Sequence, residues 1–288
     1  MRSPIDTSSL VRAKPDVVRL AAGRGGLRSA THGFARGHVQ TNLAILPQEY
    51  AFDFLRFCIR NPKPCPLVEV LDPGNPEPVR SAPGADIRTD LPAYRIFRNG
   101  EPTGEVNDIK DIWRDDHVAF LLGCSNSFDE ILEDEGIPQR HLEHPGGRIS
   151  VYSSSIQCAP AGPFKGPVAI TMRPIPHEHV DRVVELSAQF PIAHGAPVHV
   201  GNPQDVGISD LSRIDWGGYN PLRPGDVPVF WACGVTPQAV AAASGIPEMI
   251  THAPGHMFVT DLNITDQRGA GSPINFPNAK PNISREKR

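Results

Sequence analysis

The sequence of 288 residues contains no long apolar run, no excess of positive charge and no paired cysteine motif. No stretch reaches the roughly 20 apolar residues that span a bilayer, so we expect no membrane protein. The net charge of −4 and the scattered lysines and arginines argue against a nucleic-acid partner. Residues 1–30 contain arginines but no apolar signal segment, which predicts a cytoplasmic location.

The five cysteines are unevenly spaced and form neither a CxxC pair nor a zinc pattern. Free thiols in a reducing compartment fit this spacing. There is no GxGxxG, GKS or GKT motif, and nothing indicates a flavin, pyridoxal phosphate or haem. We therefore expect no cofactor, no metal and a small carboxylate as the ligand. A homodimer is compatible with the sequence.

One pattern occurs twice. Residues 118–138 read VAFLLGCSNSFDEILEDEGIP, and residues 227–247 read VPVFWACGVTPQAVAAASGIP. The two stretches align without a gap, and Cys124 falls on Cys233, an offset of 233 − 124 = 109. Each copy contains an apolar run, a cysteine, a helix-start signal and an amphipathic stretch. The repeat predicts two cysteines at equivalent points of the fold.

The remaining patterns are typical of an α/β protein. Asn99-Gly100 predicts a hairpin within residues 94–106. Helical segments are expected over residues 7–30, 47–60 and 176–189. Strands are expected over residues 66–71, 118–123, 168–172, 196–200, 227–232 and 257–262.

We interpret the chain as two domains. A main three-layer α/β domain with a mixed sheet comprises residues 1–150 and 222–288. A smaller two-layer α/β domain, residues 151–221, is inserted into it, because a βαβ-like segment separates the two cysteine repeats. The strands at 227–232 and 257–262 are expected to belong to the main sheet.

The two cysteines are the first catalytic candidates. Ser127 and Glu130 match a capping box after Cys124, and Thr236 is a cap after Cys233. Free N–H groups at a helix start would lower a thiol pKa and make the cysteine reactive. The alternative is that both are small buried residues at strand ends. The neighbouring polar or flexible residues are candidates for substrate binding: Ser125, Asn126, Gly234 and Thr236.

Residues 251–261, THAPGHMFVTD, form a second candidate cluster. His252 and His256 flank a turn, and Asp261 lies at the end of the next strand. An acid, a base and an orienting carboxylate would suit proton transfer. A two-histidine, one-carboxylate metal site and a capped polar turn are the alternatives.

Two further segments are candidates for substrate contacts. Residues 36–42, RGHVQTN, place His38, Gln40 and Asn42 just before an apolar segment. Arg148 follows the first repeat and is a candidate clamp for a carboxylate. An ordinary polar loop and a surface arginine are the alternative interpretations.

Five strings resemble the hydro-lyase family related to D-glutamate cyclase, in collinear order over roughly residues 10–265. The strings are GHVQTNLAILP, FCIRNPKPCPLVEV, FLLGCS, PVFWACGVTPQ and THAPGHMFVTDL. Residues 126–128 depart from the family pattern, which has an aromatic residue nearer Ser125. The resemblance implies a two-domain α/β lyase of the hydro-lyase type in amino acid metabolism, with the conversion of D-glutamate to 5-oxo-D-proline and water as a candidate reaction. It assigns no catalytic residue.

Three functions follow as hypotheses. In lactam formation, two helix-start loops would hold the carboxylates while His252 or His256 moves the proton. In a cofactor-independent racemase or epimerase, Cys124 and Cys233 would act on opposite faces of one carbon. In a non-catalytic metabolite-binding protein, the same cleft would bind its ligand without turnover.

Overall fold

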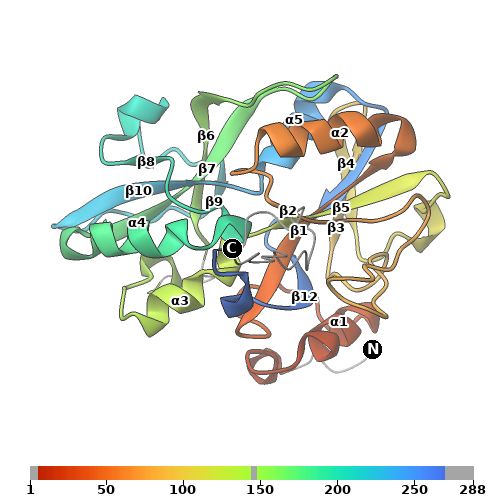
Figure 1. The fold of residues 1–288 in the computed structure, drawn as a ribbon, viewed down its shortest axis with the longest axis horizontal. Coiled ribbons are helices and arrows are strands. Elements are labelled where there is room, and N and C mark those ends of the chain that lie inside the picture. Colours follow the sequence, from red (N-terminus) through yellow and green to blue (C-terminus); the bar gives the residue numbers. More distant parts are fainter. Residues whose placement is uncertain (1–5, 144–147, 270–288) are drawn as a thin grey trace, which may run out of the picture.

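The computed structural model describes residues 6–143 and 148–269 and has two β-sheets with helices packed against them (Figure 1). The predicted α/β class is confirmed. The expected mixed sheet is wrong, because every strand pair in the described part of the chain is antiparallel.

The first sheet has the strand order β2-β5-β1-β11-β3-β4, and β12 also pairs with β1. Its strands are β1 (His38–Pro47), β2 (Leu67–Val70), β3 (Tyr94–Arg98), β4 (Glu101–Val106), β5 (His117–Gly123), β11 (Glu248–His252) and β12 (Phe258–Asn263). The second sheet has the order β8-β10-β7-β6-β9. Its strands are β6 (Ser150–Gln157), β7 (Pro167–Pro176), β8 (His199–Val200), β9 (Trp216–Gly217) and β10 (Asp226–Ala232).

Five α-helices are assigned within the described ranges, together with short 3₁₀ turns. The helices are α1 (Pro15–Gly23), α2 (Gln48–Arg60), α3 (Asp129–Asp134), α4 (Val180–Ala188) and α5 (Thr236–Ser244). The 3₁₀ turns are η1 (Thr7–Leu10), η2 (Lys110–Ile112), η3 (Ser125–Ser127), η4 (Arg140–Glu143), η5 (His177–His179), η6 (Pro191–Ala193), η7 (Pro203–Val206) and η8 (Thr265–Gln267). None of the helices in these ranges is long and apolar enough to cross a membrane.

Local sequence signals account for many of these elements. The predicted helix after Pro47 and the strands around residues 118–123 and 168–172 are confirmed. Asn99 and Gly100 have φ angles of 50° and 85°, as a tight turn between two antiparallel strands requires. The predicted hairpin at residues 94–106 therefore forms β3 and β4.

The strand predicted at residues 227–232 forms, but its expected place in the main sheet is wrong. It is β10, which lies between β7 and β8 in the second sheet. Seven consecutive residue pairs join it to β7, from Asp226–Pro176 to Ala232–Ile170. Backbone pairing decides this placement, and periodicity within one strand carries no information about the partner strand. The proposed domain bounds stay a prediction.

The internal repeat is larger than the cysteine motif. In the first sheet Asn42 of β1 pairs with Leu122 of β5, and in the second Thr171 of β7 pairs with Trp231 of β10. The offsets are 171 − 42 = 129 and 231 − 122 = 109, and the latter equals the offset between the two cysteines. A helix follows β1 and another follows β7. β2 pairs with β5 in the first sheet, as β8 pairs with β10 in the second. The unit β1-α2-β2-β5-α3 therefore corresponds to β7-α4-β8-β10-α5.

One apolar core lies on the face of the sheets that α3 and α4 cover. It contains Leu43 and Leu121 from the first sheet and Trp231 from the second. Leu132 of α3 and Val183 of α4 belong to the same cluster. The helix that follows β5 thus packs beside the helix of the other unit (Figure 1).

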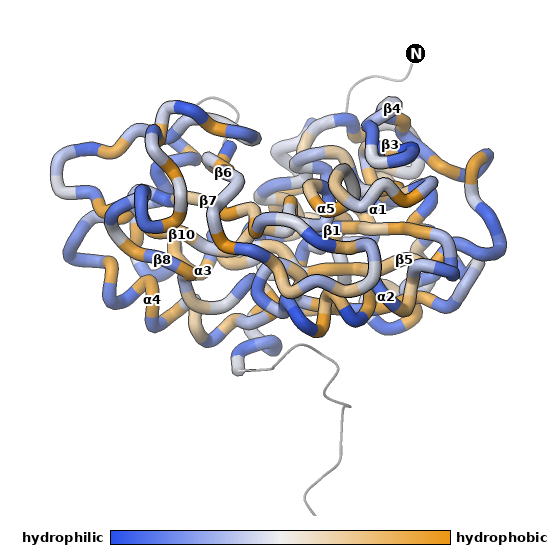
Figure 2. Tube along the Cα trace, turned by 90° about the horizontal axis from the view of Figure 1, so that it is seen from above, coloured by the Kyte–Doolittle hydropathy of each residue, from blue (hydrophilic) through white to orange (hydrophobic). Residues whose placement is uncertain are grey.

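The second core lies on the opposite face, beneath α2 and α5. Phe120 of β5 and Phe230 of β10 meet Phe54 of α2 and Val240 of α5 in this cluster. Each unit therefore contributes one helix to each face, and both cores include residues of both sheets. Figure 2 shows the two halves side by side, with β6, β7, β8 and β10 in one and β1, β3, β4 and β5 in the other.

Gly123 is a position where the two halves touch too closely for any side chain. A Cβ atom there would lie 1.7 Å from the backbone oxygen of Ile192, in the turn after α4. We predict that Gly123→Ala lowers the free energy of unfolding by about 3 kcal/mol, since a backbone carbonyl cannot move aside alone. Urea denaturation measures this loss.

Gly104→Ala is the matched control, because nothing lies within 4 Å of a Cβ atom added at that position on β4. Its free energy of unfolding should change by less than about 0.5 kcal/mol. Equal effects of the two substitutions would contradict the close contact at Gly123.

Candidate active site

A cavity of about 170 Å³ opens where β5 and β10 end, and residues of both sheets line it. The structure brings eight of the predicted residues to its wall: Asn42, Cys124, Ser125, Asn126, Arg148, Cys233, Gly234 and His252. Residues that sequence reasoning did not select also line it, among them His32, Thr171 and His194. The cavity is the candidate active site.

The two cysteines occupy equivalent places in this wall. Each thiol interacts with the backbone N–H two residues later, of Asn126 for Cys124 and of Val235 for Cys233. Burial raises the pKa of Cys124 to about 12 and that of Cys233 to about 11, and these N–H groups oppose the rise only in part. The expected lowering of the thiol pKa is therefore wrong, and both thiols are protonated at neutral pH.

The predicted capping box after Cys124 is also wrong. A 3₁₀ turn follows the cysteine, and α3 begins only at Asp129 without a side-chain cap. The Ser127 hydroxyl accepts the N–H of Gln40 at 2.8 Å, and the Glu130 carboxylate accepts the N–H of Gly37 at 2.6 Å. Both side chains therefore bind the segment that enters β1 instead of capping their own helix.

Thr236 begins α5, just after the loop that carries Cys233, and it does not line the cavity. Its hydroxyl donates to the carbonyl oxygen of Cys233 at 2.7 Å and accepts the N–H of Ala169 at 3.0 Å. It thus fastens the cysteine loop to β7. Thr236 therefore shapes the cysteine loop and is not placed for the expected contact with substrate.

Asn42 connects the two copies of the repeat. Its amide donates to the carbonyl oxygen of Gly123 at 2.8 Å, at the end of β5. On the other side it lies against Gly234, where a Cβ atom would come within 2.0 Å of the Asn42 nitrogen. Gly234 therefore acts by lacking a side chain, which allows Asn42 to reach the cavity wall.

His252 is the residue of the 251–261 segment that reaches the cavity. Its Nδ1 accepts the N–H of Leu43 at 3.2 Å, so in the neutral ring Nε2 carries the proton. Burial lowers the pKa of His252 to about 4, which keeps the ring neutral at pH 7. It can therefore donate a hydrogen bond to a bound oxygen atom.

The expected grouping of His252 with His256 and Asp261 does not form. The two ring nitrogens of His256 lie 3.0 and 3.3 Å from the carbonyl oxygens of Pro254 and Arg28. Asp261 forms an ion pair with Arg19 of α1 at 2.8 Å. The alternation of strand β12 directs its side chain away from the histidines, toward α1.

His38 and Gln40 also lie outside the cavity wall. The His38 ring contacts the carbonyl oxygens of Ala35 and Arg36. The buried Gln40 amide donates to the carbonyl oxygens of Thr31 and Phe34, at 2.8 and 3.2 Å. Gln40 therefore supports the loop that carries His32.

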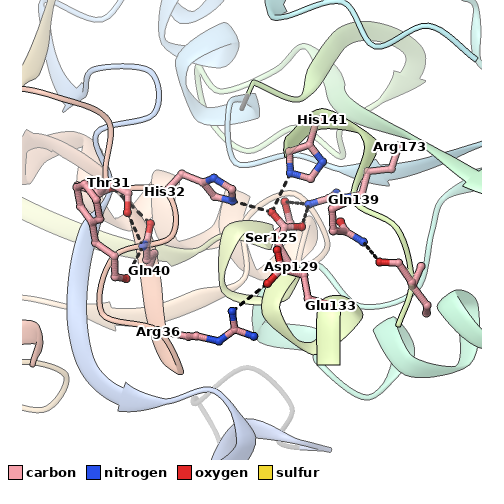
Figure 3. Close-up of polar contacts among 12 residues, drawn as sticks. Thr31, His32, Arg36, Gln40, Ser125, Asp129, Glu133, Gln139, His141 and Arg173 are labelled. Carbon is pink, nitrogen blue, oxygen red and sulfur yellow. Dashed lines mark hydrogen bonds and ion pairs between the residues drawn. The ribbon is translucent and has the colours of Figure 1, made fainter. Parts of the chain in front are cut away.

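The residues that sequence reasoning missed form a buried polar cluster beside the cavity (Figure 3). Asp129 is its centre and is 2% exposed. Its Oδ1 accepts from Arg173 at 2.6 Å, and its Oδ2 lies 3.0 Å from His32 Nε2 and 3.3 Å from His141 Nε2. Arg173 also donates to the Ser125 hydroxyl at 3.3 Å, which connects the cluster to the cavity wall.

Charge pairing determines the titration of this cluster. Burial alone would raise the pKa of Asp129, but Arg173 and the two histidines hold it well below its usual range. Burial lowers the pKa of His141, and Asp129 offsets this only in part. Burial also lowers the pKa of His32, but its hydrogen bond to Asp129 and the negative charges of Asp129 and Glu133 together outweigh that effect, so the net shift is upward.

One signal in the sequence could have revealed the cluster. Arg173 interrupts the apolar run VAITMRPIP of β7, and a buried arginine requires an anionic partner. The partner itself, Asp129, lies 44 residues away and in the other unit of the repeat. Only the folded chain brings the two together.

Comparisons with known proteins place the chain in a family. A family model described as D-glutamate cyclase matches residues 118–261. The chain belongs to the D-glutamate cyclase family. It is 54% identical to a "Putative hydro-lyase" of Stutzerimonas stutzeri, over 86% of this chain and 93% of the relative. A relative of the same designation from Thermoanaerobacter sp. is 52% identical, over 86% of this chain and 94% of its own. The predicted resemblance is confirmed.

Among solved structures, a nitrogen repressor-like protein from Methanococcus jannaschii aligns with 88% of this chain and with 97% of its own. The sequence identity is 11% and the TM-score is 0.39.

His194 makes stability depend on pH in this member of the D-glutamate cyclase family. Its Nδ1–H donates to the carbonyl oxygen of Lys63 at 2.6 Å, and burial lowers the pKa of the ring to about 4. The unfolded chain, with a histidine pKa near 6.5, takes up this proton first, so stability is lost as the pH falls from about 6.5 to 4.

We predict that His194→Asn removes about 2 kcal/mol of the loss in unfolding free energy between pH 7 and pH 5. Asparagine tolerates the φ of 77° at this position. Urea denaturation at both pH values measures the difference. His177→Asn, at an exposed histidine, should leave the pH dependence as it is. An unchanged slope in the His194 variant would contradict a buried neutral ring.

Proposed function

We propose that the protein is a hydro-lyase that acts on a small acidic substrate, with D-glutamate cyclised to 5-oxo-D-proline and water. The observation that carries this proposal is the convergence of both cysteine loops on one cavity with Arg148 in its wall. Membership of the D-glutamate cyclase family and the names of the relatives support the same chemistry. A cavity of about 170 Å³ suits a small metabolite, because pockets for drug-sized ligands measure roughly 300–1,000 Å³.

The cavity wall offers several polar groups for the two carboxylates of such a substrate. The exposed Arg148 guanidinium can pair with one carboxylate by a charge-assisted hydrogen bond. The Asn42 amide, the Ser125 hydroxyl and the His252 ring line the wall contributed by the first sheet and its loop. A folded substrate conformation between them would bring its amine close to its γ-carboxyl carbon.

The reaction balances without an added reagent. The amine, once neutral, forms a C–N bond to the γ-carboxyl carbon, and one C–O bond breaks. The ammonium group loses two protons in total, and the departing oxygen takes up two protons and leaves as water. Because both reacting groups belong to one molecule, orientation supplies a large part of the rate gain.

His252 is suited to stabilise the oxygen that develops negative charge. Its ring is neutral at pH 7, with Nδ1 occupied by the Leu43 N–H, so Nε2–H is the donor. The protonated thiols of Cys124 and Cys233 flank the same space as weak donors. Attack by a thiolate is disfavoured, because the pKa values of about 12 and 11 leave little thiolate at neutral pH.

We predict that the purified protein converts D-glutamate to 5-oxo-D-proline, measured by chromatography and by the loss of one water in mass spectrometry. His252→Gln and Cys124→Ala should lower kcat by about 10²-fold, because each removes a donor from the cavity. Arg148→Ala should mainly raise KM, because it removes a charge that binds substrate.

Cys158→Ala is the control, since this buried thiol lies in the core between the sheets and α2, outside the cavity. Full turnover in the His252, Cys124 and Cys233→Ala variants together would refute the site assignment. Binding of D-glutamate in a thermal-shift assay without any turnover would favour a non-catalytic metabolite-binding protein.

A two-thiol racemase or epimerase is the second candidate function. The specific observation in its favour is that the repeat delivers Cys124 and Cys233 to the same cavity from opposite units. Incubation of acidic amino acids and hydroxy acids in D₂O separates the two functions. We predict no deuterium at Cα during lactam formation; racemisation would introduce it, and Cys124→Ala would abolish that exchange.

A further inference from the structure

Three side chains from separate segments of the chain converge on one point beside the cavity. His32 comes from the loop before β1, Asp129 from the first turn of α3, and His141 from η4. One ligand atom of each lies within 4.8 Å of the other two. Both histidine Nε2 atoms approach the same oxygen, Asp129 Oδ2, at 3.0 and 3.3 Å (Figure 3).

The separations of 3.0 and 3.3 Å between the carboxylate oxygen and the two histidine nitrogens match those of a metal site. Ligand atoms around a tetrahedral ion with bonds of 2.0–2.1 Å lie about 3.3 Å apart. Two imidazole nitrogens and one carboxylate oxygen are a donor set that binds first-row transition ions. Three protein ligands also leave a coordination position for another molecule.

One buried nitrogen of the cluster lacks a well-formed hydrogen bond. His141 Nε2 is fully buried, and its contact with Asp129 Oδ2 at 3.3 Å does not have hydrogen-bond geometry. An orphaned buried polar atom is costly, so natural structures leave few of them. Coordination by a cation would satisfy this nitrogen.

Arg173 would act as a supporting residue. It binds Asp129 Oδ1 at 2.6 Å and leaves Oδ2 for the point where the histidines meet. Hydrogen bonds of this kind to the second oxygen orient ligating carboxylates in metal sites.

We propose that His32, Asp129 and His141 bind a divalent first-row transition ion, such as Zn²⁺ or Mn²⁺, whose open coordination position faces the cavity. His32 and Ser125 line the cavity, and the His32 side chain is 22% exposed, so an ion can enter from that side. The ion would polarise a carboxylate of the bound substrate. That role depends on the proposed function, whereas the binding of the ion does not.

The experiment uses the full chain, stripped with a chelator and equilibrated with Zn²⁺ or Mn²⁺ before gel filtration and elemental analysis. We expect about one ion per chain in the natural protein and in the His177→Ala control, which lacks an exposed histidine outside the cluster. His32→Ala and His141→Ala should weaken ion binding by at least about 100-fold. Circular dichroism verifies that both variants fold, and the partly exposed His32 is the safer of the two positions.

Co²⁺ substitution adds a readout that is independent of activity. Visible absorption of bound Co²⁺ should be present in the natural protein and absent in the folded His32→Ala variant. Less than about 0.1 ion per natural chain, or unchanged binding in both folded variants, would overturn the metal site.

The two proposals fail in different ways. Turnover of D-glutamate by ion-free protein would refute the role of the ion and leave the hydro-lyase function in place. An ion bound at these residues without turnover of any acidic substrate would support the site and contradict the function.

Discussion

The buried ion pair between Arg173 and Asp129 is the contact on which the arrangement of the site depends. Arg173 belongs to a strand of the second sheet, and Asp129 begins the helix that follows the first cysteine loop. The two are 3% and 2% exposed, so each charge would be strongly unfavourable alone. Their pairing holds the first cysteine loop against the second sheet and orients Asp129 toward both histidines.

The internal repeat explains why this contact joins two halves. In each unit the first helix lies on one face of the sheets and the last helix lies on the opposite face. On each face, a helix of one unit shares an apolar core with a helix of the other. The equivalent loops after β5 and β10 therefore meet at the centre, and their cysteines line one cavity. Gly123 and Gly234 permit the close approach, because side chains at these positions would collide with Ile192 and Asn42.

The polar groups of the cavity wall differ in charge from those of the buried cluster beside it. Near the loops, burial keeps the thiols of Cys124 and Cys233 protonated and the His252 ring neutral. Beside them, Asp129 remains charged because Arg173 and the histidines compensate it. Neutral donors beside a charge-compensated cluster are suited to an anion that must lose water, since the donors stabilise the developing oxygen and Arg148 can hold the carboxylate.

Much of the secondary structure follows from the sequence, because apolar periodicity, proline and Asn-Gly act within a few residues of one another. The hairpin at Asn99-Gly100 and the helix after Pro47 are of this kind. The repeat also located the cavity, since a cysteine that ends a strand does so in both copies. Ser127 and Glu130 show the limit, because their spacing fits a helix cap while their partners are Gly37 and Gln40 on another segment.

The sequence by itself determined the α/β class, the duplicated strand–cysteine–helix element and the family. Only the tertiary structure decided that β10 joins the second sheet, that Asp261 binds Arg19, and that Asp129 gathers two histidines and an arginine. The physical reason is the distance along the sequence over which each interaction acts. Helix and turn preferences are local, whereas strand pairing and the neutralisation of buried charge depend on partners that the chain brings together from distant positions.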